Sequence, residues 1–142
     1  MKICTHQGLL MAVLTRNEHC PLHVHVGSPL WEARFEFSFW HNGVRLWDVV
    51  PIQNQPKVAV LESLRMALKN PVHLRRARVC WWQSTKAVCL VNQGWDELAQ
   101  EVVAPHAKQP HIQLIQSASF DESRYRTILQ FKGAISPVEI EL

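Results

Sequence analysis

The sequence predicts an α+β fold, with antiparallel β-hairpins at both ends and a helical middle. Three observations support it. Residues 32–40 alternate apolar and polar side chains, which is typical of a half-buried antiparallel strand. Residues 58–68 repeat apolar side chains at steps of three and four, as one face of a helix does. Residues 111–142 return to short extended runs separated by polar turns.

A chain of 142 residues has the length of one domain or of one domain with a small addition. We expect residues 1–103 to form an N-terminal domain of β-hairpin and helix. Residues 104–142 are expected to form a C-terminal β meander. The two parts are expected to pack into one unit.

The first half of the chain is expected to contain four strands, each bounded by Gly, Pro, Asn or Ser. These strands are residues 9–15, 23–26, 32–40 and 44–50. Asn42-Gly43 predicts a type I′ hairpin turn between the last two, because that turn requires positive φ at both central residues. A two-residue loop there pairs Phe39 with Leu46 and Trp40 with Arg45.

The middle of the chain is expected to be helical. Pro56 suits the first turn of a helix, and the apolar face of residues 58–68 ends before Asn70-Pro71. The same pair can begin a second, shorter helix, although a strand over residues 77–82 fits the pattern nearly as well.

The rest of the chain has one further helix and four further strands in this interpretation. A short helix is expected after Gly94, over residues 95–103. The expected strands are residues 86–91, 111–120, 125–131 and 138–142.

Three histidines within seven residues, His19, His23 and His25, form a candidate metal site. On a strand His23 and His25 point to the same face, because successive side chains alternate. Zinc sites use three or four nitrogen, sulfur or oxygen ligands. The candidates for the third ligand are His19, Cys20, His41 and His6. Glu18 and Glu32 are the only carboxylates close by. The same pattern also suits a strand whose histidines are structural.

A basic segment offers a candidate nucleic-acid interface. The planar donor fork of arginine matches phosphate oxygens, and Trp81 and Trp82 follow at once in the sequence. The proposed phosphate contacts are Arg75, Arg76 and Arg78, with Arg45, Arg124 and Arg126 as secondary candidates. The alternative is a solvated helix face whose arginines pair with nearby carboxylates.

Composition excludes several classes. Five glycines include no Gly-rich phosphate loop, so ATP, GTP and dinucleotide chemistry are not expected. No G-x-S-x-G motif is present. No apolar run is long enough to cross a bilayer, so we expect a cytoplasmic protein that does not contact membranes. The net charge of +3 is only mildly basic.

Residues 17–26, with the acidic-apolar strand at 32–37, resemble a small bacterial protein family of unknown function. Its hallmark is an E-H-x-P-P-H-x-H-V stretch that leads into a β-hairpin and a helix; here Leu22 replaces the second proline. Residues 119–142 faintly resemble a small β-rich family often encoded beside the first. The resemblance implies toxin–antitoxin or mobile-element contexts and supplies no catalytic residues.

These observations favour a small bacterial regulatory protein without catalytic activity or cofactor. We expect a DNA-binding transcriptional regulator or antitoxin-like module that acts as a homodimer, with a co-encoded protein as a candidate partner. One alternative is a metal-dependent hydrolase or nuclease that uses His19, His23 and His25 to hold zinc or another divalent ion. The other alternative is an adaptor that binds only protein.

Overall fold

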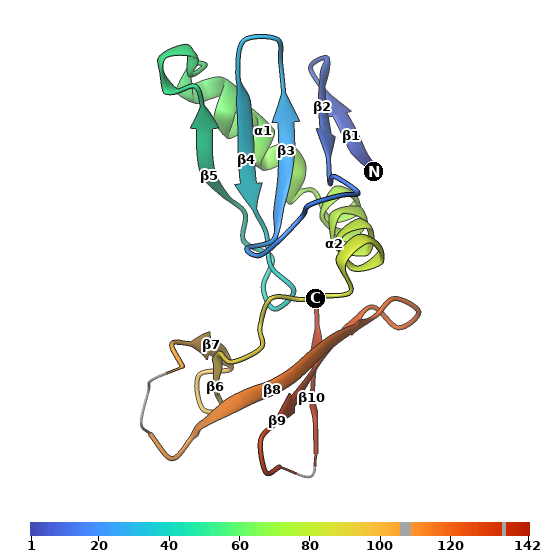
Figure 1. The fold of residues 1–142 in the computed structure, drawn as a ribbon, viewed down its shortest axis with the longest axis vertical. Coiled ribbons are helices and arrows are strands. Elements are labelled where there is room, and N and C mark those ends of the chain that lie inside the picture. The colour runs from blue at the N-terminus through green and yellow to red at the C-terminus, as the bar shows by residue number, and fades with distance from the viewer. Residues whose placement is uncertain (106–108, 135) are drawn as a thin grey trace. The chain divides into compact units, whose positions relative to one another are not determined.

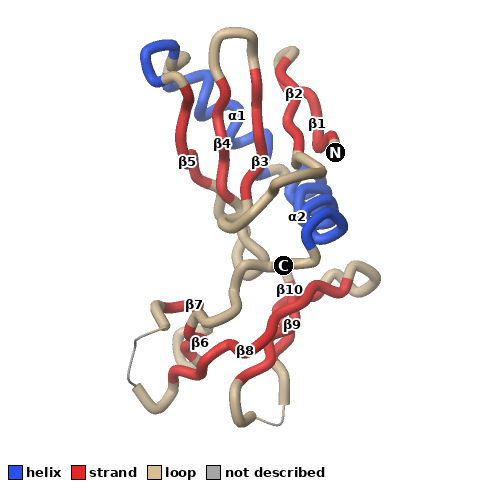
Figure 2. The backbone as a smooth tube through the Cα atoms, viewed as in Figure 1, coloured by secondary structure: helices blue, strands red, loops and turns tan. Residues whose placement is uncertain are grey.

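The α+β prediction is confirmed by the computed structural model, which describes residues 1–105, 109–134 and 136–142. The described residues form two antiparallel sheets of five strands, with two helices between them in the sequence (Figures 1 and 2). The chain divides into two compact units. The N-terminal unit comprises Met1–Ser38 and Asn42–Lys86, and the C-terminal unit comprises Phe39–His41 and Ala87–Leu142. The expected boundary between residues 103 and 104 falls inside the C-terminal unit.

The N-terminal unit is one sheet with two helices behind it (Figure 1). Its elements are β1 (Lys2–His6), β2 (Leu9–Ala12), β3 (His23–Gly27), β4 (Glu32–Glu36), β5 (Arg45–Val50), the short 3₁₀ helix η1 (Ile52–Asn54), α1 (Val58–Lys69) and α2 (Pro71–Thr85). The strands lie in sequence order. Strand β1 is not among the expected elements, and β2 and β4 end earlier than the expected strands 9–15 and 32–40 do.

The two faces of this sheet differ in polarity. Val24, Val26 and Phe35 are fully buried on one face. Because side chains alternate along a strand, the other face carries His25, whose register partner is Arg34. The register continues from Arg34 to Asp48 on β5, so a polar row crosses this second face. We call this second face, with His25, Arg34 and Asp48, the open face.

The basic segment, for which the sequence allowed a helix or a strand, is helical. Residues 71–85 form helix α2. Pro71 occupies its first turn, where a missing N–H costs nothing. The Asn70 side-chain oxygen accepts a hydrogen bond from the backbone N–H of Val72 at 3.0 Å and caps the helix. These local signals outweigh the β-branched and aromatic residues that follow them.

The expected two-residue hairpin loop at Asn42-Gly43 is not formed, although β4 and β5 do lie on either side of this pair in the sequence. β4 ends at Glu36, and the observed pairs are Phe35 with Leu46 and Glu36 with Arg45. The alternation beyond β4 has another origin. Phe39 is buried in the C-terminal unit, with its ring centroid 4.9 Å from that of Phe120.

The C-terminal unit is an antiparallel sheet in the strand order β10-β9-β8-β6-β7. Its strands are β6 (Gly94–Asp96), β7 (Glu101–Val103), β8 (Ile112–Asp121), β9 (Arg126–Phe131) and β10 (Val138–Glu141). The expected C-terminal meander is confirmed by β8, β9 and β10.

Two expectations in the C-terminal unit are wrong. The helix over residues 95–103 is a pair of short strands. They are joined by a turn in which Asp96 Oδ1 accepts hydrogen bonds from the backbone N–H groups of Leu98 and Ala99. The strand over residues 86–91 is irregular, because Lys86 and Cys89 have left-handed φ values of 53° and 61°. Neither of the described helices is long and apolar enough to span a membrane.

Candidate metal centre

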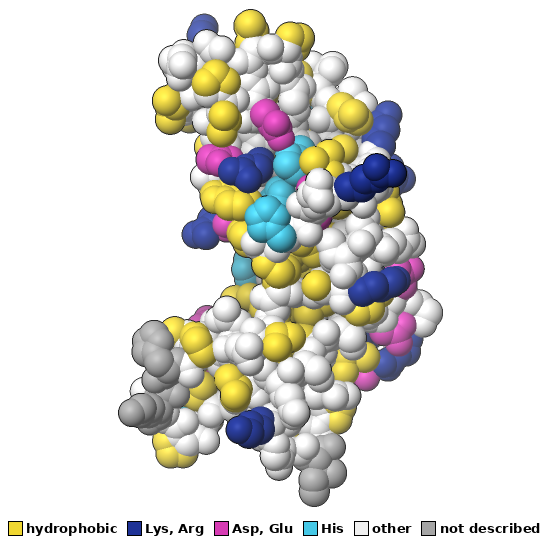
Figure 3. Space-filling view, in the orientation of Figure 1, with side chains coloured by type: hydrophobic (Ala, Val, Ile, Leu, Met, Phe, Trp, Pro, Cys, Tyr) yellow, Lys and Arg dark blue, Asp and Glu magenta, His cyan; other side chains and the backbone are white. Residues whose placement is uncertain are grey.

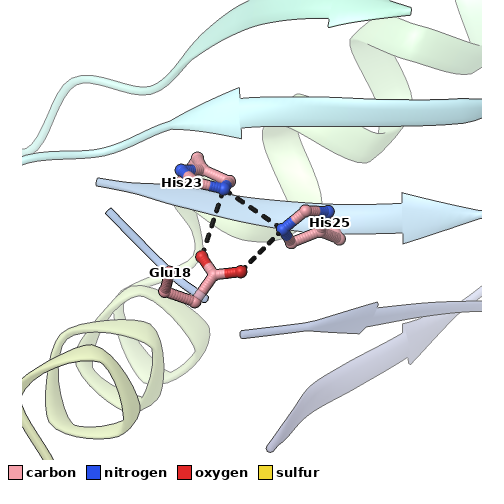
Figure 4. A group of neighbouring side chains, drawn as sticks. All are labelled: Glu18, His23 and His25. Atoms are coloured by element: carbon pink, nitrogen blue, oxygen red, sulfur yellow. Dashed lines mark hydrogen bonds and ion pairs between the residues drawn. The ribbon is translucent and has the colours of Figure 1, made fainter. Parts of the chain in front are cut away.

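Three potential metal ligands meet on the open face of the N-terminal sheet (Figure 4). Glu18, His23 and His25 each offer a ligand atom, and these atoms lie within 4.8 Å of one another. The Nε2 atoms of the two histidines are 3.1 Å apart. Glu18 Oε1 lies 3.0 Å from Nε2 of His25, and Oε2 lies 3.1 Å from Nε2 of His23.

The strand and the loop before it position these side chains differently. His23 and His25 share a face of β3 because they are two residues apart, as the sequence predicts. Glu18 lies in the irregular segment 13–22, which connects β2 to β3. Asn17 precedes it with φ of 61°, a left-handed conformation that asparagine adopts more easily than most residues. The loop can therefore return Glu18 toward the two imidazoles.

Hydrogen bonds at the far side of each imidazole fix where its proton lies. His23 Nδ1 contacts the Pro21 carbonyl oxygen at 2.7 Å. His25 Nδ1 contacts Oε1 of Glu32. Because a carbonyl oxygen or an ionised carboxylate can only accept, each Nδ1 donates a proton. In the neutral ring, Nε2 is then the atom with the free lone pair, and both Nε2 atoms face Glu18.

When both imidazoles are neutral, the centre brings hydrogen-bond acceptors together without a donor. Two nitrogen lone pairs and two carboxylate oxygens then converge with no hydrogen atom between them. Glu18 Oε2 is buried and makes no hydrogen bond with the described residues. The side chains of Glu18 and His23 are only 4% and 3% exposed, so bulk water does not solvate them. Such a cluster is stabilised by a cation, either a proton or a metal ion.

The spacing of the ligand atoms suits a first-row transition metal. With bonds of about 2.0–2.1 Å to the ion, ligand atoms lie roughly 2.9 Å apart at a right angle and about 3.4 Å apart in a tetrahedron. The two Nε2 atoms are 3.1 Å apart, and each lies 3.0–3.1 Å from the Glu18 oxygen nearer to it, so these separations fall inside this interval. Imidazole nitrogen also favours zinc, iron, nickel or copper over calcium or magnesium.

The surroundings favour neutral imidazole at His23. Burial lowers its pKa, and this outweighs the Pro21 hydrogen bond and the Glu18 charge, which both raise it. Aromatic rings supply part of that burial: the centroids of Trp47 and Trp81 lie 5.1 Å and 5.5 Å from the His23 ring. Neutral imidazole is the form that binds metals.

The centre is open to solvent on one side. The His25 side chain is 16% exposed, more than either of the other two ligands. The space-filling view shows histidine side chains at the surface of this face, with acidic and basic side chains beside them (Figure 3). A small molecule can therefore approach the centre from the His25 side.

Two of the three residues that meet here, His23 and His25, are among the candidate ligands expected from the sequence. His19, the third histidine of the cluster, is exposed, and its ring centroid lies 6.5 Å from that of His23. His6, another candidate, is hydrogen-bonded to Ser63 Oγ at 2.7 Å. Glu18 takes the third position instead. Its closeness in sequence was the available signal, but no pattern predicts the path of an irregular loop.

The N-terminal arginines do not gather into one exposed group. Arg78 is 1% exposed, and it donates hydrogen bonds to the Ser38 carbonyl at 2.8 Å and to Asn42 Oδ1 at 2.9 Å. A phosphate could reach it only if this part of α2 moved away. Arg75 and Arg76 are exposed on the same helix, and Arg76 also donates to the Ile3 carbonyl.

The remaining arginine candidates pair with carboxylates. On β5, Arg45 donates a hydrogen bond to Glu36. In the C-terminal unit, Arg124 pairs with Asp121 and Glu139, and Arg126 lies 3.4 Å from a Glu141 oxygen. These three arginines lie outside helix α2, so their ion pairs do not test the alternative of a solvated helix face.

Comparison with known proteins adds no relative to this description. The chain matches no family model, no curated protein and no solved structure. The geometry of the centre therefore carries the functional argument.

Proposed function

We propose that the N-terminal unit binds a divalent transition-metal ion through Glu18, His23 and His25 and acts as a metal-dependent hydrolase. The observation that carries this proposal is the convergence of both Nε2 atoms on a buried carboxylate, one oxygen of which makes no hydrogen bond within the described part of the chain. Two histidines and one carboxylate are the ligand set of several catalytic zinc and iron sites.

Three protein ligands favour catalysis over a structural role. Structural zinc sites are closed by four protein ligands, whereas catalytic sites keep a position for water. A zinc ion in such a site lowers the pKa of its bound water to about 7, which supplies a nucleophile at neutral pH. The exposed side at His25 gives a substrate access to that position.

The outer hydrogen bonds also match those of metal sites. Ligating histidines usually donate their second N–H to a carbonyl or a carboxylate, which orients the ring. His23 does so to Pro21, and His25 does so to Glu32. The three ligand positions are also the glutamate and the last two histidines of the E-H-x-P-P-H-x-H-V stretch, so the proposal extends to chains that share it.

Elemental analysis of the purified protein tests metal binding. We expect one zinc or iron ion per chain, and none in a His23→Ala/His25→Ala variant. A His6→Ala/His73→Ala variant is the matched control, because it also removes two histidines of this unit while leaving the centre intact. Wild-type protein that stays metal-free after incubation with zinc contradicts the proposal.

Hydrolysis is tested separately on the metal-loaded protein. We expect it to cleave a chromogenic ester, either p-nitrophenyl phosphate or p-nitrophenyl acetate, and to lose this activity on chelation. A protein that holds its metal but cleaves neither ester would have a structural site, which contradicts the catalytic half of the proposal.

Nucleic-acid binding through the arginines stays a prediction with weaker support. Arg78 is buried, and Arg45, Arg124 and Arg126 have carboxylate partners. Phosphate contacts make affinity fall steeply with salt. A DNA and RNA titration at two salt concentrations, with an Arg75→Ala/Arg76→Ala variant, tests the prediction. The expected homodimer and co-encoded partner likewise stay predictions.

A further inference from the structure

Arg34 is a cationic neighbour of the proposed centre on the open face, and its charge acts on His23. It is the register partner of His25, and directly opposed residues of antiparallel strands have Cβ atoms about 4.5–5.5 Å apart. Its hydrogen bond to Asp48 is the main cause that raises the pKa of Arg34, and the charges of Glu32 and Glu18 add to it. The guanidinium is therefore within electrostatic reach of the centre.

The guanidinium is held in place but keeps one free nitrogen. Nε donates to Asp48 Oδ1 at 2.8 Å, and Nη2 donates to Asp48 Oδ2. The Trp47 ring lies below the group, with its centroid 4.0 Å from Cζ. Nη1 makes no hydrogen bond with the described residues, although the Arg34 side chain is only 29% exposed. A fixed, partly shielded N–H donor of this kind suits an oxyanion.

The charge balance makes anion binding depend on the metal. Three carboxylates, Glu18, Glu32 and Asp48, surround the single positive charge of Arg34. Without metal this group is anionic and repels a phosphate. A divalent ion brings the group to neutrality and places a second cationic centre on the same face of the sheet as Arg34.

We propose that the metal centre takes a phosphate ester, with Arg34 Nη1 binding one non-bridging oxygen while a second oxygen lies on the ion. Paired metal and arginine contacts are a common means of stabilising the charge of a phosphoryl group. This inference rests on the proposed metal-dependent hydrolase. In the reaction, water adds to phosphorus and the bond from phosphorus to the ester oxygen breaks. One proton of the water ends on the departing alcohol, and the other stays on the phosphate.

Phenylphosphonate, which cannot be hydrolysed, is the probe for this proposal. We expect calorimetric titration to show binding to the zinc-loaded protein and none to the metal-free protein. Arg34→Lys keeps the charge next to Asp48 and loses the spare donor, so its affinity should fall by about tenfold or more. Asp48→Asn removes the neutralising charge from Arg34, so the affinity should rise.

Arg65→Lys is the matched control for these variants. Arg65 also donates Nε and Nη2 to one carboxylate, that of Glu62, and its side chain is 27% exposed. It lies on α1, and its Nη1 already donates to the Val44 carbonyl. The control should bind the probe as the wild type does. The zinc content of every variant is measured first, which separates lost probe binding from lost metal or misfolding.

The outcomes distinguish this inference from the function on which it rests. A wild-type protein that takes up no zinc overturns the proposed function itself. Zinc-loaded protein whose probe affinity is equal in the wild type and Arg34→Lys overturns only the role of Arg34. Benzoate binding as tightly as phenylphosphonate overturns the assignment of phosphate esters as the substrate class.

Discussion

Replacing Glu18 by glutamine is the sharpest single test of the centre. The substitution keeps the size of the side chain and removes the only carboxylate among the three proposed ligands. Loss of one outer hydrogen-bond partner typically lowers metal affinity by about 10–100-fold, and loss of a ligand should cost at least as much. We expect Glu18→Gln to bind zinc at least 100-fold more weakly than the wild type.

The magnitude follows from mass action. Zinc at about 100 times its dissociation constant stabilises the native state of the wild type by roughly 2.7 kcal/mol. The same concentration is at most about equal to the dissociation constant of Glu18→Gln, and it then contributes only about 0.4 kcal/mol. For a chain of 142 residues, roughly 2–4 °C per kcal/mol gives a zinc-induced rise in Tm of about 5–10 °C in the wild type. The rise should be no more than about 1–2 °C in the variant.

Thermal unfolding with and without zinc measures this difference. Glu36→Gln is a suitable control, because Glu36 lies on β4 in the same sheet and pairs with Arg45 instead of an imidazole. It should show the full zinc-induced rise. A Glu18→Gln protein whose Tm rises with zinc as much as that of the wild type would refute our assignment of the third ligand.

Three further predictions concern groups around the centre and in the core. Glu32→Gln should weaken zinc binding by about tenfold, because a neutral amide oxygen orients the His25 ring less strongly than a carboxylate does; a chelator competition measures this. Arg78→Met should lower the free energy of unfolding by about 3 kcal/mol in urea titrations, because it leaves buried acceptors without their donor. The hydrogen bond from Arg34 lowers the pKa of Asp48, so its stabilising contribution is fully present above the ordinary pKa of an aspartate and is lost as the pH falls below that value and through the lowered pKa of the folded state. The stability difference between wild type and Asp48→Asn should therefore be constant near neutral pH and shrink as the pH falls below about 4.

Each of these predictions has its own control and its own contradicting result. Zinc affinity that is unchanged in Glu32→Gln would show that this residue does not orient the ligand. Lys57→Met changes an exposed position just before α1, where the side chain makes no capping hydrogen bond, and should alter stability by no more than about 0.5 kcal/mol. An Arg78→Met protein as stable as this control would contradict the core role of Arg78. A pH-independent difference for Asp48→Asn would show that the ion pair does not contribute.

Hydrophobic patterns that arise from a single helix or strand predicted the fold well. The helix over residues 58–69 and the three C-terminal strands follow from periodicity and turn residues, and the structure confirms them. The hairpin at Asn42-Gly43 failed because the alternation through Phe39 has two causes. β4 accounts for its first part, and packing of Phe39 beside Phe120 in the C-terminal unit accounts for the rest. A sequence pattern does not distinguish two buried environments from one.

Tertiary packing also explains why the burial of Arg78 could not be predicted from the sequence. The sequence correctly allowed a helix at residues 71–85, and helical spacing then places Arg75 and Arg78 on related faces. It does not say that the Ser38 carbonyl and the Asn42 side chain reach that helix from a distant loop and bury Arg78. Whether a basic side chain faces solvent is decided by tertiary packing, which residue type and spacing do not report.

The proposed metal centre could be predicted from the sequence only in part. Strand alternation is enough to place His23 and His25 together, and no tertiary contact is needed for that step. The third ligand depends on the loop, where a left-handed Asn17 allows Glu18 to return over β3. A buried carboxylate aimed at two lone pairs is unfavourable on its own. The loop conformation is therefore best explained if a cation offsets that cost, so we expect zinc to protect the segment 13–22 from proteolysis and from hydrogen exchange. Equal protection with and without zinc would mean that protons alone hold Glu18 in place.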